Sequence, residues 1–187
     1  MPGHPTFPQP RVSSRWGITT ALLALGLALF TQLTFAGGPT LKVGDPFPDL
    51  SKFGIEGKLP HTLKGKIVVV DFWASWCGPC KDSFPVMEEL HRRFSDKGLV
   101  ILAINVDESR AAMEEFLKEH PVTFTVVRDA KKKLVAAVNI ASMPTSFILD
   151  ADGKVHSIHN GFRGVETRKK YIKEIQELLK ITSAKNE

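Results

Sequence analysis

The residues of this chain best suited to chemistry are its two cysteines, and both fall in the segment Cys77-Gly78-Pro79-Cys80. A structural disulfide usually closes a longer loop, because its stabilising effect comes from restricting the unfolded chain. The loop that a disulfide between these cysteines would close spans only four residues, cysteines included, so it would restrict the unfolded chain little. The pair is therefore better suited to a disulfide that opens and closes by thiol–disulfide exchange.

The elements on either side of the pair must present it at the start of a helix. Residues 66–73 contain a β-branched run that predicts a strand buried on both faces, in a central parallel position. After the pair, apolar side chains recur every three or four residues, which predicts a helix. Those side chains are Phe84, Met87, Leu90 and Phe94.

This placement gives the two cysteines different roles. Cys77 would lie at the helix N-terminus, where unpaired N–H groups and the macrodipole stabilise a thiolate and lower the thiol pKa. Cys80 would lie one turn further into the helix, less exposed, as the resolving thiol. Pro79 would stiffen the first turn, where it has no N–H to lose.

The rest of the chain alternates strands with helices. Residues 146–149 and 154–159 flank an Asp-Ala-Asp-Gly turn, which predicts a β-hairpin. This order predicts an α/β sandwich with a mixed central sheet flanked by helices. The other predicted elements are strands at 99–106 and 123–127, helices at 134–138 and 165–179, and a short helix marked by Met113, Phe116 and Leu117 that stops before Pro121.

The first 36 residues form a separate segment. No acidic residue precedes Asp45, and Arg11 and Arg15 precede an apolar run over residues 18–30. Thr34-Phe35-Ala36 then offers small residues before a cleavage site, so residues 1–36 are predicted to be a secretory signal peptide. The apolar run is short for a membrane span, but extending it to Phe35 leaves an uncleaved membrane anchor as the alternative.

Composition limits the remaining possibilities. The chain has 187 residues, 43% hydrophobic and 24% charged, so residues 37–187 suffice for one globular domain. The net charge is +5, but the basic residues are spread along the chain, which favours solvated lysines over a nucleic-acid partner. Two cysteines exclude a four-cysteine zinc or iron–sulfur site. No metal or organic cofactor is predicted, since the five histidines of residues 37–187 are scattered without ligand spacing: His61, His91, His120, His156 and His159.

Residues 70–81 resemble the active-site segment of thioredoxin almost residue for residue. Pro85 matches that family's helix-kinking proline, and Met143-Pro144-Thr145 resembles its cis-proline loop. Residues 44–50 resemble the opening of exported thioredoxin-like proteins of the TlpA/ResA type. The stretch from 105 to 142 is long enough for the additional helix and strand of that group. The resemblance therefore implies a thioredoxin-like sandwich with an extra helix–strand insertion.

The resemblance also implies a role for each matching residue. Cys77 attacks a substrate disulfide, and Cys80 then attacks Cys77 and releases the reduced product. Asp71 matches the buried aspartate beneath the resolving cysteine. Its pKa should rise on burial, so that it accepts the Cys80 proton. Thioredoxin places a lysine beside this aspartate, whereas the matching position here is Ala103.

Five further residues are expected to contact substrate. Trp76 adjoins the nucleophile and would pack against a bound protein, whereas Trp73 is expected to serve core packing. Pro144 is expected to be cis and to leave the Met143 backbone free to pair with an extended substrate segment. Gly78 and Pro79 form the dipeptide of thioredoxin, which the resemblance associates with reducing members.

The leading hypothesis is an exported reductase of protein disulfides, located in the periplasm or another extracytoplasmic compartment, free or anchored to the inner membrane. A reductase in an oxidising compartment must be recharged, so the resemblance implies a membrane thiol electron donor. The client could be an apocytochrome c or another protein with paired thiols. An oxidase or isomerase is a second enzymatic interpretation. An extracytoplasmic copper-binding chaperone using Cys77 and Cys80 is the alternative from another class.

Overall fold

The structure, a computed structural model, describes residues 40–185. The predicted signal peptide or anchor, residues 1–36, lies outside the described residues. A five-stranded mixed sheet forms the centre of the described part, with strand order β3-β2-β1-β4-β5. The strands are β1 (Ile67–Trp73), β2 (Leu99–Asn105), β3 (Thr125–Arg128), β4 (Thr145–Leu149) and β5 (Val155–Asn160).

Strand β1 occupies the middle of this sheet. It pairs in parallel with β2 and antiparallel with β4, and all seven of its residues are buried. A strand covered on both faces needs apolar side chains at successive positions, which the run from Ile67 to Val70 supplies. The predicted central position is therefore confirmed. The hairpin prediction is confirmed as well, since β4 and β5 pair antiparallel.

Three helices cover one face of the sheet: α1 (Gly78–Phe94), α2 (Arg110–Glu119) and α4 (Val165–Lys185). Successive parallel steps from β1 to β2 to β3 run the same way across the sheet, so right-handed crossovers place α1 and α2 on the same side. The Trp73 ring contacts Phe84 of α1 at 4.6 Å and Phe116 of α2 at 4.8 Å between centroids. Trp73 is fully buried, so its predicted core role is confirmed.

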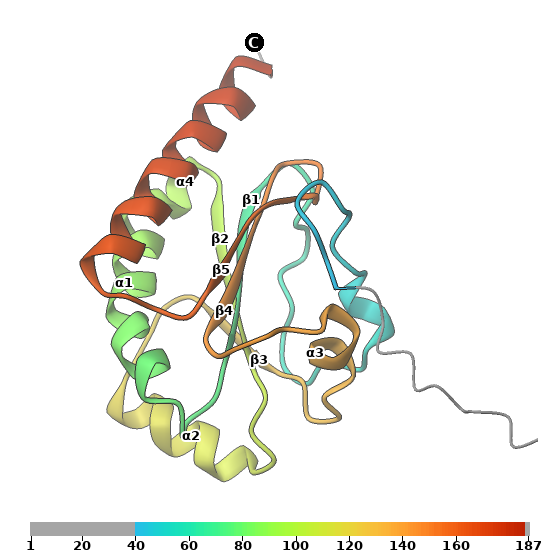
Figure 1. Ribbon diagram of the computed structural model, residues 1–187, viewed down its shortest axis with the longest axis vertical. Coiled ribbons are helices and arrows are strands. Elements are labelled where there is room, and N and C mark those ends of the chain that lie inside the picture. Colours follow the sequence, from blue (N-terminus) through green and yellow to red (C-terminus); the bar gives the residue numbers. More distant parts are fainter. Residues whose placement is uncertain (1–39, 186–187) are drawn as a thin grey trace, which may run out of the picture. The chain divides into compact units, whose positions relative to one another are not determined.

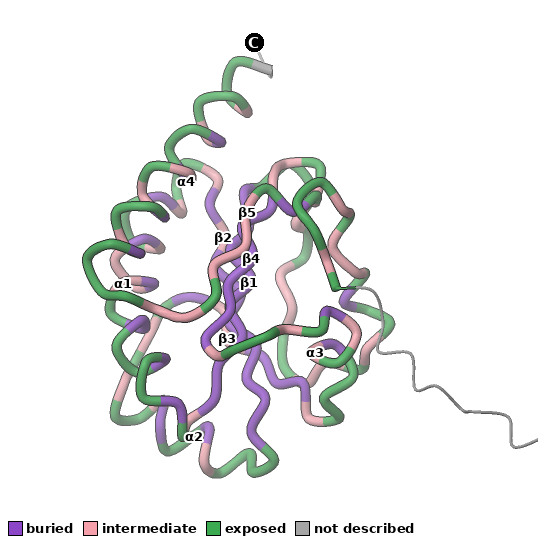
Figure 2. Tube along the Cα trace, in the orientation of Figure 1, coloured by how far each residue is buried: buried purple, intermediate pink, exposed green. Residues whose placement is uncertain are grey.

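The opposite face is covered by α3 (Lys133–Val138) and the segment that precedes β1 (Figure 1). There Phe147 of β4 contacts Phe47 at 5.5 Å and Phe72 of β1 at 6.0 Å between ring centroids. Figure 2 shows the result as a buried sheet between helices whose outward surfaces are exposed. The core thus lies in two layers, one on each side of the sheet.

Several element boundaries differ from the sequence expectation, and those of β3 and α4 differ by more than one residue. Strand β3 begins at Thr125 rather than 123, and α4 continues six residues beyond 179 to Lys185. In the added turns of α4 Ile181 is exposed, so the apolar periodicity there is weak. The predicted extra helix and strand are present as α2 and β3, within residues 105–142.

Candidate active site

The two cysteines lie where β1 gives way to α1. Cys77 is the N-cap of α1, with extended backbone angles, and Pro79 follows in the first turn. The chain arrives along a buried strand and turns into the helix at Cys77, which leaves the first N–H groups without partners inside the helix. In this first turn the N–H of Cys80 donates both to the Cys77 carbonyl at 3.1 Å and to Sγ of Cys77 at 3.3 Å. The helix start therefore points a donor at this sulfur, as expected for a group that must carry negative charge.

The sulfurs of Cys77 and Cys80 are joined in a disulfide. Cys77 retains 5% of its exposure, whereas Cys80 is fully buried. The predicted order of exposure is therefore confirmed, and Cys77 is the more accessible of the two residues. An access difference of this kind decides which sulfur of a disulfide is attacked.

In the reduced protein we expect iodoacetamide to alkylate Cys77 faster than Cys80, by roughly tenfold or more near neutral pH, because Cys77 combines access with the N–H donors of the helix start. The single variants Cys77→Ser and Cys80→Ser leave one thiol each, so the two rates can be measured separately by mass spectrometry. Faster labelling of Cys80 would reverse the assignment of nucleophile and resolving thiol.

The loop before β4 carries the predicted cis bond, which is confirmed between Met143 and Pro144. Pro144 is buried and Met143 is half-buried. The carbonyl of Pro144 accepts from the N–H of Gly161 at 2.7 Å, and the hydroxyl of Thr145 donates to the Ser142 carbonyl at 2.7 Å. These two bonds fix the loop on both sides of the proline.

Trp76 is the most exposed large apolar side chain of the described residues, at 72%. It immediately precedes Cys77, and the neighbouring Gly78 and Pro79 are exposed too. An exposed indole beside a reactive sulfur has the character of a docking surface, because it offers apolar area that nothing in the described chain covers.

Asp71 is fully buried in the middle of β1, which confirms its predicted burial. Side chains two residues apart on a strand share a face. Asp71 therefore lies on the same face as Trp73, which packs against Phe84 of α1, the helix that carries Cys80. In the sheet register, β2 places Ala103 beside Asp71 and β4 places Ser146 beside it.

Burial raises the pKa of Asp71 from its ordinary 3.8 to about 7, because the low-dielectric interior penalises the carboxylate. The Ser146 hydroxyl donates to its Oδ1 at 2.5 Å and offsets part of this rise. Its other oxygen, Oδ2, has no hydrogen-bond partner among the described residues. A carboxyl group with a pKa near neutrality and a free oxygen can accept and return a proton.

Asp107 holds the loop before the cysteines and was not anticipated from the sequence. Its carboxylate accepts from the N–H of Ser75 at 3.0 and 3.2 Å and from the amide of Asn105 at 2.8 Å. Asp107 follows β2 as Ser75 follows β1, and adjacent parallel strands end at the same edge of a sheet. The sequence therefore contained a signal for this role, because Asp107 is a carboxylate just past the end of a strand, at the sheet edge that carries the cysteines.

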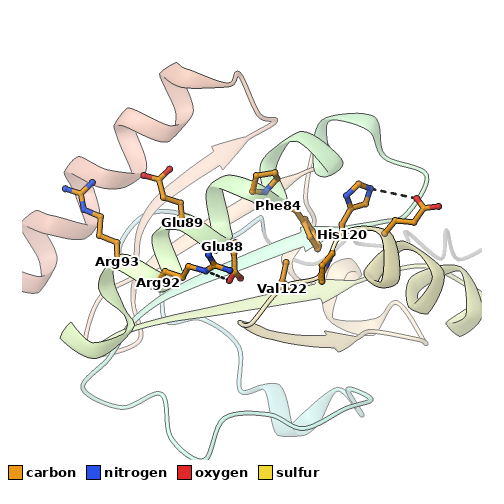
Figure 3. Close-up of a pocket in the computed structure, with 10 residues that line it drawn as sticks. Phe84, Glu88, Glu89, Arg92, Arg93, His120 and Val122 are labelled. Carbon is orange, nitrogen blue, oxygen red and sulfur yellow. Dashed lines mark hydrogen bonds and ion pairs between the residues drawn. The ribbon is translucent and has the colours of Figure 1, made fainter.

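A cavity of about 650 Å³ lies elsewhere, between α1 and the α2–β3 connection (Figure 3). Its lining includes Phe84, Glu88, Glu89 and His120 but neither cysteine. Glu88 bonds to Arg92 and Thr123, and Glu89 bonds to Arg168, so these carboxylates are already paired within the protein. We do not assign this cavity to the cysteine chemistry.

The described residues offer neither a metal site nor a membrane-spanning helix. Among residues 40–185, no group of three or more histidine, cysteine, aspartate or glutamate side chains is placed to hold a metal ion. Within the same range, no helix combines the length and apolar character needed to cross a membrane.

Comparison with known proteins supports the same chemistry. Residues 42–175 match the Redoxin family. Thiol-disulfide oxidoreductase ResA of Bacillus subtilis (strain 168) is 35% identical over 154 residues, which cover 81% of this chain and 86% of that protein. The protein of the same name from Geobacillus kaustophilus (strain HTA426) is 32% identical over 172 residues, 90% of this chain and 98% of that protein.

Solved structures agree with the fold. A crystal structure described as thiol:disulfide interchange protein DsbE from Chlorobium tepidum superposes with a TM-score of 0.69 at 36% identity, covering 75% of this chain and 99% of that one. StoA from Bacillus subtilis superposes with a TM-score of 0.52 at 28% identity, covering 58% of this chain and 84% of that one. The mixed sheet with its helices is therefore thioredoxin-like.

Proposed function

Because this chain belongs to the Redoxin family and is a thiol-disulfide oxidoreductase of the ResA and DsbE type, we propose that it works as an exported reductase of protein disulfides. The observation that carries the proposal is the Cys77–Cys80 pair at the start of α1, with Cys77 as the accessible sulfur and Gly78-Pro79 between the two. A pair so placed stabilises the attacking thiolate while it keeps the resolving thiol within reach.

The reaction begins with both cysteines reduced. The Cys77 thiolate attacks one sulfur of a substrate disulfide, a mixed disulfide forms, and the other substrate sulfur leaves as a thiolate that takes up a proton. Cys80 then loses its proton to Asp71 and attacks Sγ of Cys77. The Cys77–Cys80 bond forms, and the second substrate sulfur leaves. Two electrons have passed from the cysteine pair to the substrate.

The exposed surface around Cys77 would hold the substrate. Trp76 offers apolar area beside the sulfur, with Gly78 and Pro79 leaving the approach open. The backbone of Met143, held next to Pro144, would pair with an extended segment of the substrate. Backbone pairing is largely independent of sequence, so this mode suits a protein that reduces more than one client.

The same proposal includes the compartment in which the protein works and the source of electrons that reduces its cysteine pair again. Residues 1–36 would direct export to the periplasm or another extracytoplasmic space, as a cleaved signal or as an inner-membrane anchor. An oxidising compartment cannot regenerate the reduced pair, so a membrane thiol protein would donate the electrons. An apocytochrome c with paired thiols is a fitting client, because such thiols must be reduced before haem attachment.

A trapping experiment tests this function. The Cys80→Ser variant keeps the nucleophile but cannot release it, so in cells it should accumulate mixed disulfides on Cys77 that mass spectrometry can identify. The Cys77→Ser/Cys80→Ser variant is the matched control and should capture nothing. Adducts confined to cytoplasmic proteins, or no adducts above that control, would contradict the proposed role.

A further inference from the structure

The buried carboxylate of Asp71 stands at the end of a chain of three polar groups from three elements. Ser146 of β4 donates to Asp71 Oδ1 at 2.5 Å, and its hydroxyl lies 2.8 Å from the hydroxyl of Tyr171 in α4. Asp71 is 0% exposed, and Ser146 and Tyr171 are 1% exposed each. A polar chain this deeply buried is held rigidly, since each member would be costly to leave unpaired.

The direction of the chain follows from counting protons. A serine hydroxyl has one proton, and that of Ser146 is committed to Asp71. The Tyr171 hydroxyl must therefore donate to Ser146, although either atom could donate by distance alone. The chain runs one way, from Tyr171 to Ser146 to Asp71, and every donor points toward an ionised carboxylate.

We propose that Ser146 and Tyr171 are positioning residues that confine the exchangeable proton of Asp71 to Oδ2. A proton on Oδ1 would have to be donated to the Ser146 hydroxyl, and either the Ser146 or the Tyr171 hydroxyl proton would then lack an acceptor within this chain of three groups. A proton on Oδ2 leaves the chain intact, and Oδ2 is the oxygen without a partner there. The inference rests on the proposed function in which Asp71 accepts the Cys80 proton.

Ser146 also supplies the hydrogen-bond donor that the other neighbouring strand, β2, lacks. On β2 the residue beside Asp71 is Ala103, which offers no donor, whereas β4 on the other side offers Ser146. Without any donor, burial alone would keep the carboxyl protonated and unable to act as a base near neutral pH. The Ser146 bond lowers the pKa of Asp71 against that burial and so keeps the base usable.

Other titratable groups lie close to this chain. Tyr171 of α4 is linked to Asp71 through the Ser146 hydroxyl. Burial raises the pKa of Tyr171 above its ordinary value. His159 of β5 and Glu174 of α4 bond to each other and lie beside Tyr171. In the oxidised protein the cysteines do not titrate, so Asp71 can be followed alone.

The experiment measures the pKa of Asp71 in the oxidised protein through its carboxyl carbon by NMR, assigned with the Asp71→Asn variant. Ser146→Ala should raise that pKa by about one unit, because the carboxylate loses a charge-assisted donor. Tyr171→Phe keeps the ring and should raise it by less, since it acts through Ser146. Ser146→Thr restores a hydroxyl and should return the pKa toward the wild-type value. Ser157→Ala, which removes a hydroxyl that bonds to Glu174 instead, is the matched control.

A second measurement is the rate at which a mixed disulfide is released in a single turnover, recorded as a function of pH. The pH at which this rate falls on the acid side, the acid limb, should be higher in the same variants. An unmoved pKa and acid limb in both Ser146→Ala and Tyr171→Phe would overturn the inference, as would a rate reduced equally at all pH values. If Ser146→Ala does not fold, Tyr171→Phe decides the matter alone. Loss of the inference leaves the proposed function standing, which fails separately if Cys80→Ser traps no adducts above its double-serine control.

Discussion

Cys77→Ser is expected to abolish reduction of protein disulfides with a dithiol donor. Serine keeps the size and the N-cap position, but its hydroxyl neither ionises near neutral pH nor forms a mixed disulfide. Cys80 cannot replace it, because Cys80 is fully buried while Cys77 retains access. The measurement is the reduction of a protein disulfide by purified protein without residues 1–36, compared with wild type.

A matched control separates lost chemistry from lost structure. Cys77→Ser cannot form the Cys77–Cys80 disulfide, so the fair comparison is with reduced wild type, and the two should unfold at nearly the same temperature. If the variant kept full activity and wild type bound copper with sub-micromolar affinity, the copper-chaperone alternative would replace the reductase.

Asp71→Asn should slow turnover by about 10²-fold near neutral pH, because the amide cannot accept the Cys80 proton. Asn has nearly the shape of Asp, and Ser146 can still donate to its oxygen, so the packing of β1 should survive. The deficit should shrink as pH rises toward the thiol pKa, because Cys80 then ionises unaided. Turnover equal to wild type between about pH 6 and pH 9 would show that Asp71 is structural and that solvent takes the proton.

Asp71→Asn should also change how the free energy of unfolding depends on pH. The pKa of Asp71 is about 7 in the folded protein and near 3.8 when unfolded, so between these values only the folded state holds the proton. Raising the pH through this window therefore favours unfolding, with about 1.4 kcal/mol for each unit of difference as the upper limit. Denaturant unfolding of the oxidised proteins should show wild type losing stability from about pH 4 to pH 7 relative to Asp71→Asn. Parallel pH profiles would contradict the raised pKa.

Much of the molecule follows from local sequence. The run from Ile67 to Val70 predicts a buried strand and the apolar spacing after Cys80 predicts a helix with one covered face, and both are observed. Their junction places Cys77 at a helix N-terminus, so the position of the nucleophile needed no long-range information. The end of α4 was less accurate, because exposed residues such as Ile181 carry no periodic signal.

What surrounds the cysteines was decided only by tertiary structure. Ser146 lies 75 positions along the chain from Asp71, and Asp107 lies 32 positions from Ser75. The register of β1 against β4 brings Ser146 beside Asp71, and the packing of α4 on the same face brings Tyr171 to both. A sequence pattern records which side chains face the core but not which strand neighbours which or in what register. The nucleophile could therefore be assigned from the sequence, whereas the partners that set the proton-accepting oxygen of Asp71 could not.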